Sequence, residues 1–249
     1  MKSTSKTATL ILIMSLILPS LSLAFGPDVT RKTLELGEFQ SIYVNSNYTV
    51  YLKQSNKQEV RIEVLTEIYS ISEYKVENGV LHINIQRKKA DPNASIWAKI
   101  DDIKIAPTMN VYVSMRDISQ LKVNGGGKII GENSLASNKL DLAVTGSGSM
   151  NLDLKGREVT TKISGSGSIT LKGYASNNNI EMSGSGSLLA FACELENAQT
   201  ELSGSGTCEI NVSNELNATV YGTGIVKIKG STKTIVQKVY GQGAVDRAY

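Results

Sequence analysis

The chain has 249 residues, of which 22 are glycine, 4 are proline and 6% are aromatic. Its 26 lysines and arginines nearly balance 23 aspartates and glutamates, which leaves a formal net charge of +3. This balance gives no electrostatic basis for binding nucleic acid, and the composition favours many short strands with tight bends over helices.

Residues 1–24 have the pattern of a secretory signal peptide. Two lysines precede an apolar run that ends in small residues, with Ser22 and Ala24 at the positions that signal peptidase prefers. A retained membrane anchor is the alternative, although Pro19 and several serines interrupt the roughly 20 apolar residues that a span requires. We expect cleavage near Ala24 and no stable membrane span afterwards.

The exported chain is expected in the periplasm, at the outer surface or in the medium of a bacterium. Loss of the two leader lysines lowers the formal net charge from +3 to +1, because 24 Lys and Arg remain against 23 Asp and Glu. The only cysteines are Cys193 and Cys208. Neither lies near the cleavage site, so we do not expect a lipoprotein.

Residues 25–115 are β-rich but irregular. Alternation of apolar and polar residues predicts strands in the segments 41–54, 59–66, 79–87, 102–107 and 110–115. These strands are expected to be either wide, imperfect rungs or an N-terminal cap over an open sheet edge. A polar loop at 88–99 carries the only tryptophan, Trp97.

Residues 116–249 repeat a Gly-x-Gly unit. The pairs are Gly125 and Gly127, Gly146 and Gly148, Gly165 and Gly167, Gly184 and Gly186, Gly204 and Gly206, Gly222 and Gly224, and Gly241 and Gly243. The steps between the first glycines are 21, 19, 19, 20, 18 and 19 residues. Such a steady period is typical of repeat architectures.

Apolar residues recur at fixed distances from each unit. Two positions before the first glycine lie Val123, Val144, Ile163, Met182, Leu202, Val220 and Val239. Two positions after the second glycine lie Ile129, Met150, Ile169, Leu188, Cys208, Val226 and Val245. Because the positions between are mostly polar, each repeat is predicted to have strands with one inward face on either side of a glycine corner.

Repeats stacked about 4.8 Å apart would place equal offsets above one another in continuous apolar columns. This predicts an all-β fold, a single-stranded parallel β-helix or β-solenoid with rungs of about 19 residues, continuous with the less regular part in one domain. The corner glycines would allow positive φ or close approach to the next rung. Five corners have Ser or Thr in the middle, whose hydroxyls would exchange hydrogen bonds along the stack: Ser147, Ser166, Ser185, Ser205 and Thr223.

A long β-meander or a β-sandwich is the alternative fold. Neither normally repeats one bend tripeptide at a fixed period, which favours the solenoid.

The order of segments resembles a known bacterial family. "FQSIYVNSNYTVYLKQ" at 39–54, "GVLHINIQ" at 79–86 and "VYVSMRDISQLKVNGGGKI" at 111–129 lead into "SGSGSITLKG" at 164–173 and its repeats. This order is similar to the family of putative auto-transporter adhesins with a head GIN domain, over nearly all of the mature chain. The resemblance implies a β-helical, exported cell-envelope protein, and it brings no catalytic or binding residues with it.

No pattern in the chain predicts a cofactor or metal site. Each glycine unit opens a strand, unlike phosphate-binding loops. None is followed by the Asp of calcium-binding solenoid repeats, and four units carry Ser or Thr at that position. The single histidine, His82, is expected to face solvent, so a zinc site or a histidine-based triad is not readily assembled. We do not expect the protein to be an enzyme. One alternative is a polysaccharide-active β-helix enzyme, which would have an acidic cluster in a groove. A second alternative is an ice-binding solenoid.

Equal offsets also bring outward charges together. Two exposed cross-rung pairs are expected, worth about 0.2 to 1 kcal/mol each: Asp153 with Lys172, and Glu209 with Lys227. A further column contains Lys162, Glu181 and Glu201. Its two like charges would either hold a cation or face solvent.

The repeat that follows Gly186 has 20 residues, one more than its predecessor. A β-bulge there would turn Leu189, Phe191 and Cys193 inward. Without the bulge, Leu189 and Phe191 would form an exposed apolar patch with Tyr174, and with Trp97 these residues are the candidate contact surface. Cys193 and Cys208 are expected to lie too far apart for a disulfide.

The sequence therefore predicts a non-enzymatic, exported cell-envelope protein that acts as a structural or adhesin-like binding module. Its partner would be an envelope component, either a glycan or a protein. Only a few residues follow Gly243, so an uncovered last coil could also associate end to end with a second copy.

Overall fold

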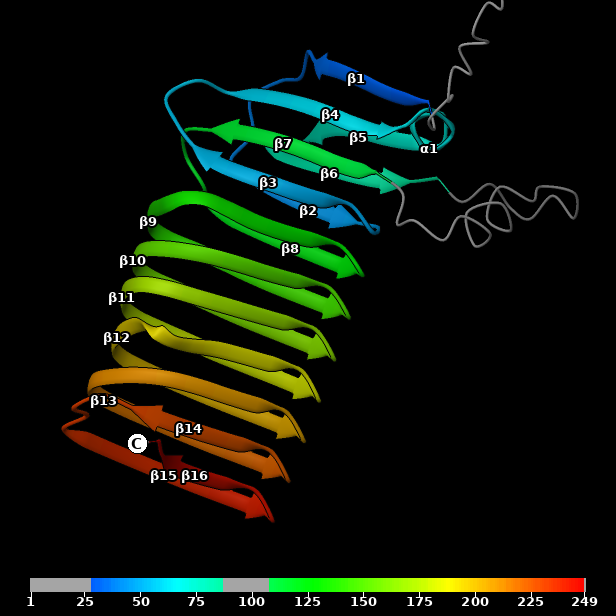
Figure 1. Ribbon diagram of the computed structural model, residues 1–249. Coiled ribbons are helices and arrows are strands. Elements are labelled where there is room, and N and C mark those ends of the chain that lie inside the picture. The colour runs from blue at the N-terminus through cyan, green and yellow to red at the C-terminus, as the bar shows by residue number, and fades with distance from the viewer. Residues whose placement is uncertain (1–27, 87–107, 249) are drawn as a thin grey trace, which may run out of the picture.

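The structure is a computed structural model that describes residues 28–86 and 108–248. The expected signal peptide, the expected strand at 102–107 and Trp97 lie outside the described residues. The described chain forms an elongated stack of coils that continues from a β-rich N-terminal part (Figure 1).

The described residues form a 16-stranded sheet and one short helix. The N-terminal part contains β1 (Val29–Leu34), β2 (Ser41–Asn45), β3 (Thr49–Gln54), β4 (Glu59–Leu65), α1 (Thr66–Tyr69), β5 (Ser72–Glu77), β6 (Val80–Ile85) and β7 (Met109–Met115). The coils contain β8 (Gln120–Gly125), β9 (Lys128–Gly146), β10 (Ser149–Gly165), β11 (Ser168–Gly184), β12 (Ser187–Gly204), β13 (Thr207–Gly222), β14 (Ile225–Lys229), β15 (Thr234–Gly241) and β16 (Ala244–Arg247).

The predicted β-solenoid is confirmed. Neighbouring strands from β8 to β16 pair in parallel. The first glycines of successive corners pair with one another along the stack, from Gly125 with Gly146 to Gly222 with Gly241. One sequence period of about 19 residues therefore corresponds to one coil, and equivalent positions of successive coils are paired in register.

The two glycines of a corner meet different requirements. The first glycine has a positive φ at every corner, for example +108° at Gly165, where a side chain would strain the backbone. The second glycine lies against the preceding coil, and a Cβ on Gly167 would be 2.6 Å from the carbonyl oxygen of Gly148. The first glycine meets both requirements, since a Cβ on Gly165 would also lie 2.8 Å from the Gly146 carbonyl oxygen, whereas the second glycine meets close approach alone.

Backbone hydrogen bonds tie the corners together. The amide of Ser166 donates to the carbonyl of Gly146 at 2.9 Å, and the amide of Ser168 donates to the carbonyl of Gly148 at 3.0 Å. The expectation that the middle Ser and Thr hydroxyls bond along the stack was wrong, since no such bond occurs among the described residues. These side chains lie at the bend, and Ser166 is exposed to solvent.

Variation in coil length is confined to one wall of the solenoid. We call the eight residues that end at each first glycine the regular wall, because they pair without a register shift. They are residues 139–146, 158–165, 177–184, 197–204, 215–222 and 234–241. The residues after each corner form the variable wall, which contains the register shifts between Asn151 and Asp153 and between Thr170 and Lys172.

The extra residue of the 20-residue repeat forms a β-bulge on the variable wall, where β12 is visibly kinked (Figure 1). The register against β11 shifts between Leu189 and Ala192. Cys193 is buried and Phe191 is half-buried, but Leu189 keeps 40% of its surface exposed. The expectation that Leu189 turns inward was wrong, because the extra residue enters the strand only after it.

The N-terminal part supplies two further rungs and a cap. β2 and β3 pair in parallel with β8 and β9, and β6 and β7 pair in parallel with β2 and β3. β5, β4 and β1 then add antiparallel strands at the outer edge. Both structures expected from the sequence, rungs and a cap, therefore occur.

No helix among the described residues is long and apolar enough to cross a membrane.

The last coil carries polar residues at inward positions. Gln237 pairs with the buried Ala218, and Arg247 pairs with the buried Ile228. The Arg247 guanidinium donates to the carbonyls of Gly230 at 3.3 Å and Thr232 at 3.4 Å. Inward polar and charged groups of this kind discourage further strand pairing at a sheet edge.

The interior is a continuous apolar core that also holds both cysteines. Cys193 and Cys208 are buried and free, and burial raises the pKa of each thiol to about 12. One polar pair crosses the core, where Thr161 Oγ1 donates to Asn178 Oδ1 at 3.1 Å.

Substitution of a corner glycine tests the stacking constraint. Gly167→Ala places a Cβ against the Gly148 carbonyl, so we expect a loss of about 2 kcal/mol or more in the free energy of unfolding, measured by denaturant titration. Gly37→Ala is the control, since a Cβ there meets nothing within 4 Å, and its change should stay within about 0.5 kcal/mol. Equal stability of the two variants would contradict close packing at the corners.

Thiol reactivity tests the burial of the cysteines. At pH 8 the native protein should not react with Ellman's reagent, whereas both thiols should react in concentrated guanidinium chloride without added reductant. The thiol pKa of about 12 in the folded protein lies above the value of about 8.5 in the unfolded chain. The stabilisation from burying the neutral thiols is therefore complete below pH 8.5, and the free energy of unfolding declines as the pH rises toward 12. Rapid labelling of the native protein would contradict the buried placement.

Candidate functional site

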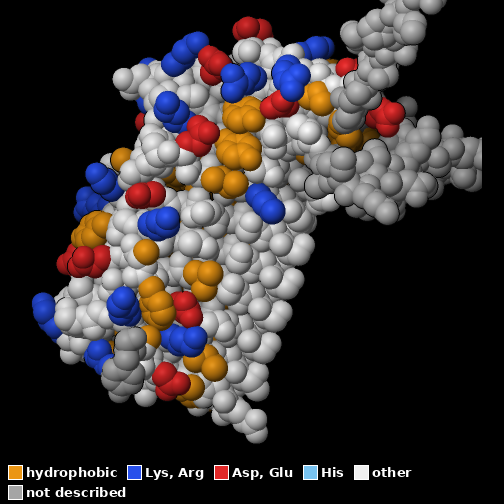
Figure 2. Space-filling view, viewed as in Figure 1, with side chains coloured by type: hydrophobic (Ala, Val, Ile, Leu, Met, Phe, Trp, Pro, Cys, Tyr) orange, Lys and Arg blue, Asp and Glu red, His pale blue; other side chains and the backbone are white. Residues whose placement is uncertain are grey.

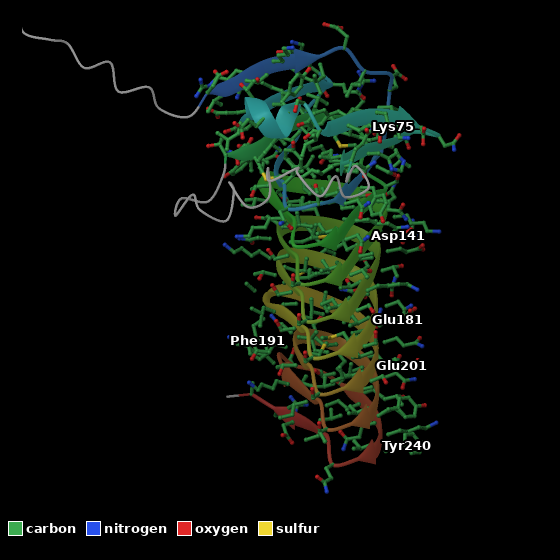
Figure 3. The ribbon with its side chains drawn as sticks, turned by 90° about the vertical axis from the view of Figure 1, so that its right-hand side faces the viewer. Lys75, Asp141, Glu181, Phe191, Glu201 and Tyr240 are labelled. Carbon is green, nitrogen blue, oxygen red and sulfur yellow. The ribbon has the colours of Figure 1, made fainter. Side chains whose placement is uncertain are left out.

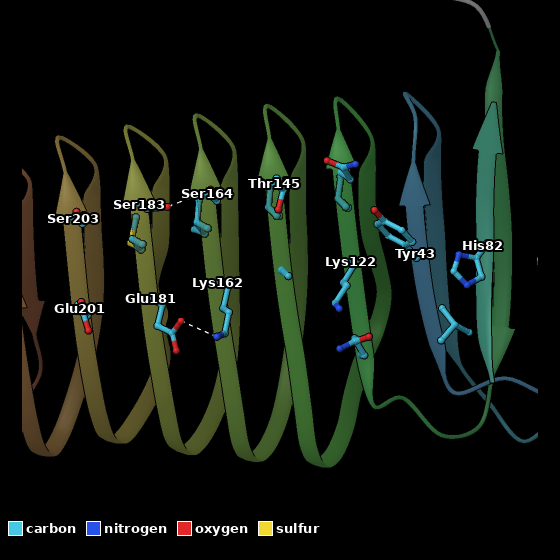
Figure 4. A pocket seen from close by; sticks show the side chains of 18 residues that line it. Tyr43, His82, Lys122, Thr145, Lys162, Ser164, Glu181, Ser183, Glu201 and Ser203 are labelled. Carbon is cyan, nitrogen blue, oxygen red and sulfur yellow. Dashed lines mark hydrogen bonds and ion pairs between the residues drawn. The ribbon is translucent and has the colours of Figure 1, made fainter. Parts of the chain in front are cut away.

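A shallow groove of about 910 Å³ runs along the regular wall and its continuation in β8, β2 and β6 (Figure 4). Its lining residues come from each rung between β6 and β12. Because this wall keeps a constant register, its outward side chains form straight columns parallel to the solenoid axis. Two such columns line the groove.

The first column, which we call the charged column, contains Tyr43, Lys122, Ala143, Lys162, Glu181 and Glu201 in successive rungs. Lys162 Nζ lies 2.7 Å from Glu181 Oε2, and both side chains are about half exposed. Among the described residues Lys122 and Glu201 belong to no ion pair, and beyond Glu201 the column continues through Thr219 to Lys238. The small side chain of Ala143 leaves an opening between Lys122 and Lys162.

The second column, which we call the hydroxyl column, contains Thr145, Ser164, Ser183 and Ser203, each directly before a corner glycine. Ser183 Oγ donates to Ser164 Oγ at 3.2 Å, the hydroxyl contact between rungs that had been expected at the middle corner position. The column begins in β8 with Asn124. These short side chains offer donors and acceptors one rung apart.

Aromatic side chains lie near both ends of this face. Tyr43 contacts His82 of the next rung edge to face, with ring centroids 5.7 Å apart. At the other end the hydroxyl column continues into Tyr221 and Tyr240, which stack with centroids 5.1 Å apart and are 43% and 55% exposed. Figure 3 shows Tyr240 on the same side of the solenoid as Glu181 and Glu201.

The two carboxylates of the charged column, Glu181 and Glu201, lie in neighbouring rungs of one wall. Lys162 neutralises Glu181, which leaves that carboxylate less available to a cation. Among the described residues, no group of three His, Cys, Asp or Glu side chains could hold a metal ion.

The described residues of the contact surface suggested by the sequence lie outside the groove. Leu189 and the half-buried Phe191 lie on the variable wall, and Figure 3 shows Phe191 on the side opposite Glu181 and Glu201. Tyr174 is 40% exposed, and its hydroxyl donates to Glu196 Oε2 at 3.1 Å. Trp97 lies outside the described residues.

Of the two predicted cross-rung ion pairs, one forms and the other does not. Lys227 Nζ lies 3.0 Å from Glu209 Oε1, so this ion pair is confirmed. Asp153 and Lys172 are paired in register, but they do not form an ion pair.

Sequence reasoning found Lys162, Glu181 and Glu201 of the charged column but missed the aromatic residues near both ends of the face. The stacked tyrosines could have been found by reading the position before each first glycine, where the series of small hydroxyl residues ends in Tyr221 and Tyr240. Tyr43 and His82 could not have been found in this way, because their rungs lack the Gly-x-Gly unit from which positions in the repeat are counted.

Residues 38–232 match the family described as "Putative auto-transporter adhesin, head GIN domain", so the resemblance noted in the sequence is confirmed. No curated protein matches the chain.

Solved structures share the fold. A putative adhesin from Bacteroides fragilis is similar with a TM-score of 0.80 and 20% identity, covering 90% of this chain and 98% of that one. A putative adhesin from Parabacteroides distasonis has a TM-score of 0.69 and 23% identity, and a putative lipid binding protein from the same species has 0.70 and 19%. Each covers 89% of this chain and 97% of its own, and identities this low show the fold alone.

The Lys162–Glu181 pair should contribute little to stability, because both side chains are about half exposed. A double-mutant cycle with Lys162→Ala and Glu181→Ala should give a coupling of about 0.2 to 1 kcal/mol in denaturant unfolding, reduced by added salt. A much larger or salt-independent coupling would contradict this solvent-screened geometry.

Proposed function

Since this chain belongs to the head GIN domain family of putative auto-transporter adhesins, we propose that it is an exported protein of the cell envelope that acts by binding another envelope component. The groove along the regular wall is the binding surface. The family is described as one of putative adhesins and not of enzymes, which supports a role without turnover.

The observation that carries this proposal is the regularity of the grooved wall. Coil-length differences fall on the variable wall, whereas the grooved wall pairs from coil to coil without a shift. Its side chains are therefore held on a rigid sheet before any ligand arrives, which lowers the entropic cost of binding. An extended, pre-formed surface of this kind suits an extended partner.

The proposed location follows from the expected signal peptide at residues 1–24. After cleavage the protein would reside in the periplasm, at the outer surface or in the medium, and it would not be a lipoprotein. Its net charge close to zero is compatible with contact to either acidic or neutral envelope material.

Obstruction of the groove tests the proposal. Ala143→Trp fills the opening between Lys122 and Lys162, so capture of envelope fractions by the immobilised protein should fall at least tenfold. Thr170→Trp adds the same side chain to the variable wall and should leave capture unchanged. Absence of capture by the unmodified protein, or turnover of an envelope polysaccharide, would overturn the proposed function.

A further inference from the structure

The face that carries the groove has aromatic residues near both ends and polar groups between them. Tyr43 lies in the rung of β2, and Tyr221 lies in β13, six rungs farther along the same wall through β8, β9, β10, β11 and β12. At about 4.8 Å per rung, the two positions are roughly 29 Å apart along the axis. The ligand that uses the whole face must therefore be long and linear.

The middle of the face offers hydrogen bonds rather than apolar anchors. The hydroxyl column repeats a donor and an acceptor in each rung from Thr145 to Ser203. Lys122 and Glu201, which form no ion pair among the described residues, add a donor at one end and a carboxylate acceptor at the other. A ligand with hydroxyl groups along its length would satisfy these positions.

The charges of the charged column nearly cancel. Lys162 is neutralised by Glu181, and Lys122 is offset by Glu201, while Lys238 continues the column in the rung of Tyr240. A strongly anionic or cationic polymer would thus meet both attraction and repulsion. A largely uncharged ligand fits this surface better.

A peptide fits it less well. Extended peptides bind by adding a strand to a sheet edge, and helical or proline-rich peptides need an apolar or aromatic-lined groove. The regular wall presents the face of the sheet, with its backbone groups already paired from coil to coil. The groove is lined mainly by hydroxyl, amide and charged side chains on its outward positions.

We infer that the ligand of this face is a linear, largely uncharged glycan that lies parallel to the solenoid axis. Its hydroxyl groups bind the hydroxyl column, Lys122 and Glu201, and its sugar rings pack on Tyr43 at one end and on the exposed Tyr221–Tyr240 stack at the other. This inference rests on the proposed binding function and specifies the class of ligand.

The first test separates the ligand class from the function. Envelope fractions are treated with periodate, which cleaves vicinal diols of sugars, or with protease, and then captured by the immobilised protein. Periodate should abolish capture and protease should leave it intact. Capture that survives periodate and is lost with protease would overturn the glycan while leaving the binding function in place; no capture from untreated fractions would overturn the function itself.

The second test locates the ligand on the protein. Periodate-sensitive polysaccharide from the captured fraction is partly hydrolysed, size-graded and titrated calorimetrically. Affinity should rise with chain length until the chain spans the roughly 29 Å between Tyr43 and Tyr221, and it should change less than threefold on raising the salt concentration. Affinity that is independent of length, or that collapses in salt, would overturn the axial, uncharged ligand.

Variants of the aromatic ends complete the test. Tyr43→Ala and the double substitution Tyr221→Ala with Tyr240→Ala should each weaken binding at least tenfold, and Tyr221→Trp with Tyr240→Ala should restore part of it by returning an exposed ring. Tyr174→Ala is the matched control, because Tyr174 is equally exposed but lies off this face. Unfolding curves identical to the unmodified protein exclude misfolding, and unchanged affinity in both alanine variants would overturn the assigned contacts.

Discussion

The close approach of successive corners is the constraint on which the rest of the structure depends. The second glycine of each unit lies so near the preceding carbonyl that no Cβ fits, as the 2.6 Å distance at Gly167 shows. The first glycine supplies the positive φ that turns the chain toward the next rung. Together they place every corner directly beneath the last, and the corner amides then close the same hydrogen bonds in each coil.

A constant register at the corner makes the wall before it a lattice of columns. Any residue type that recurs at one offset becomes a line of identical chemistry along the axis, as the hydroxyl column from Thr145 to Ser203 demonstrates. Irregular coil lengths are absorbed on the other wall, where the bulge in β12 follows the exposed Leu189. Figure 2 shows one face of the molecule, on which the edge formed by the corners is free of charged side chains, while charges lie near the N-terminal cap and along the opposite side. The proposed function depends on this separation of a regular face from a variable one.

How much of the site could be read from the sequence depended on the distance from the glycine units. Lys162, Glu181 and Glu201 were placed in one column correctly, because each lies at a fixed offset from a glycine. Tyr43 and His82 join that column only through strands that lack the unit, and their pairing with Lys122 spans many residues of chain. The inward position of Arg247 follows from its offset of four residues after Gly243, but its hydrogen bond to the Gly230 carbonyl could not be predicted from the repeat.

The sequence by itself determined the solenoid, its period, its inward columns and the order of charges along the outside. These follow from local alternation and from repetition, so each coil repeats the physics of its neighbour. Only the tertiary structure decided that β6 and β7 lie outside β2 and β3, that antiparallel strands close that end, and that the extra residue of β12 enters after Leu189. Those outcomes depend on which edges remain free for pairing and on how side chains fill the space between unequal coils, and no periodicity encodes either.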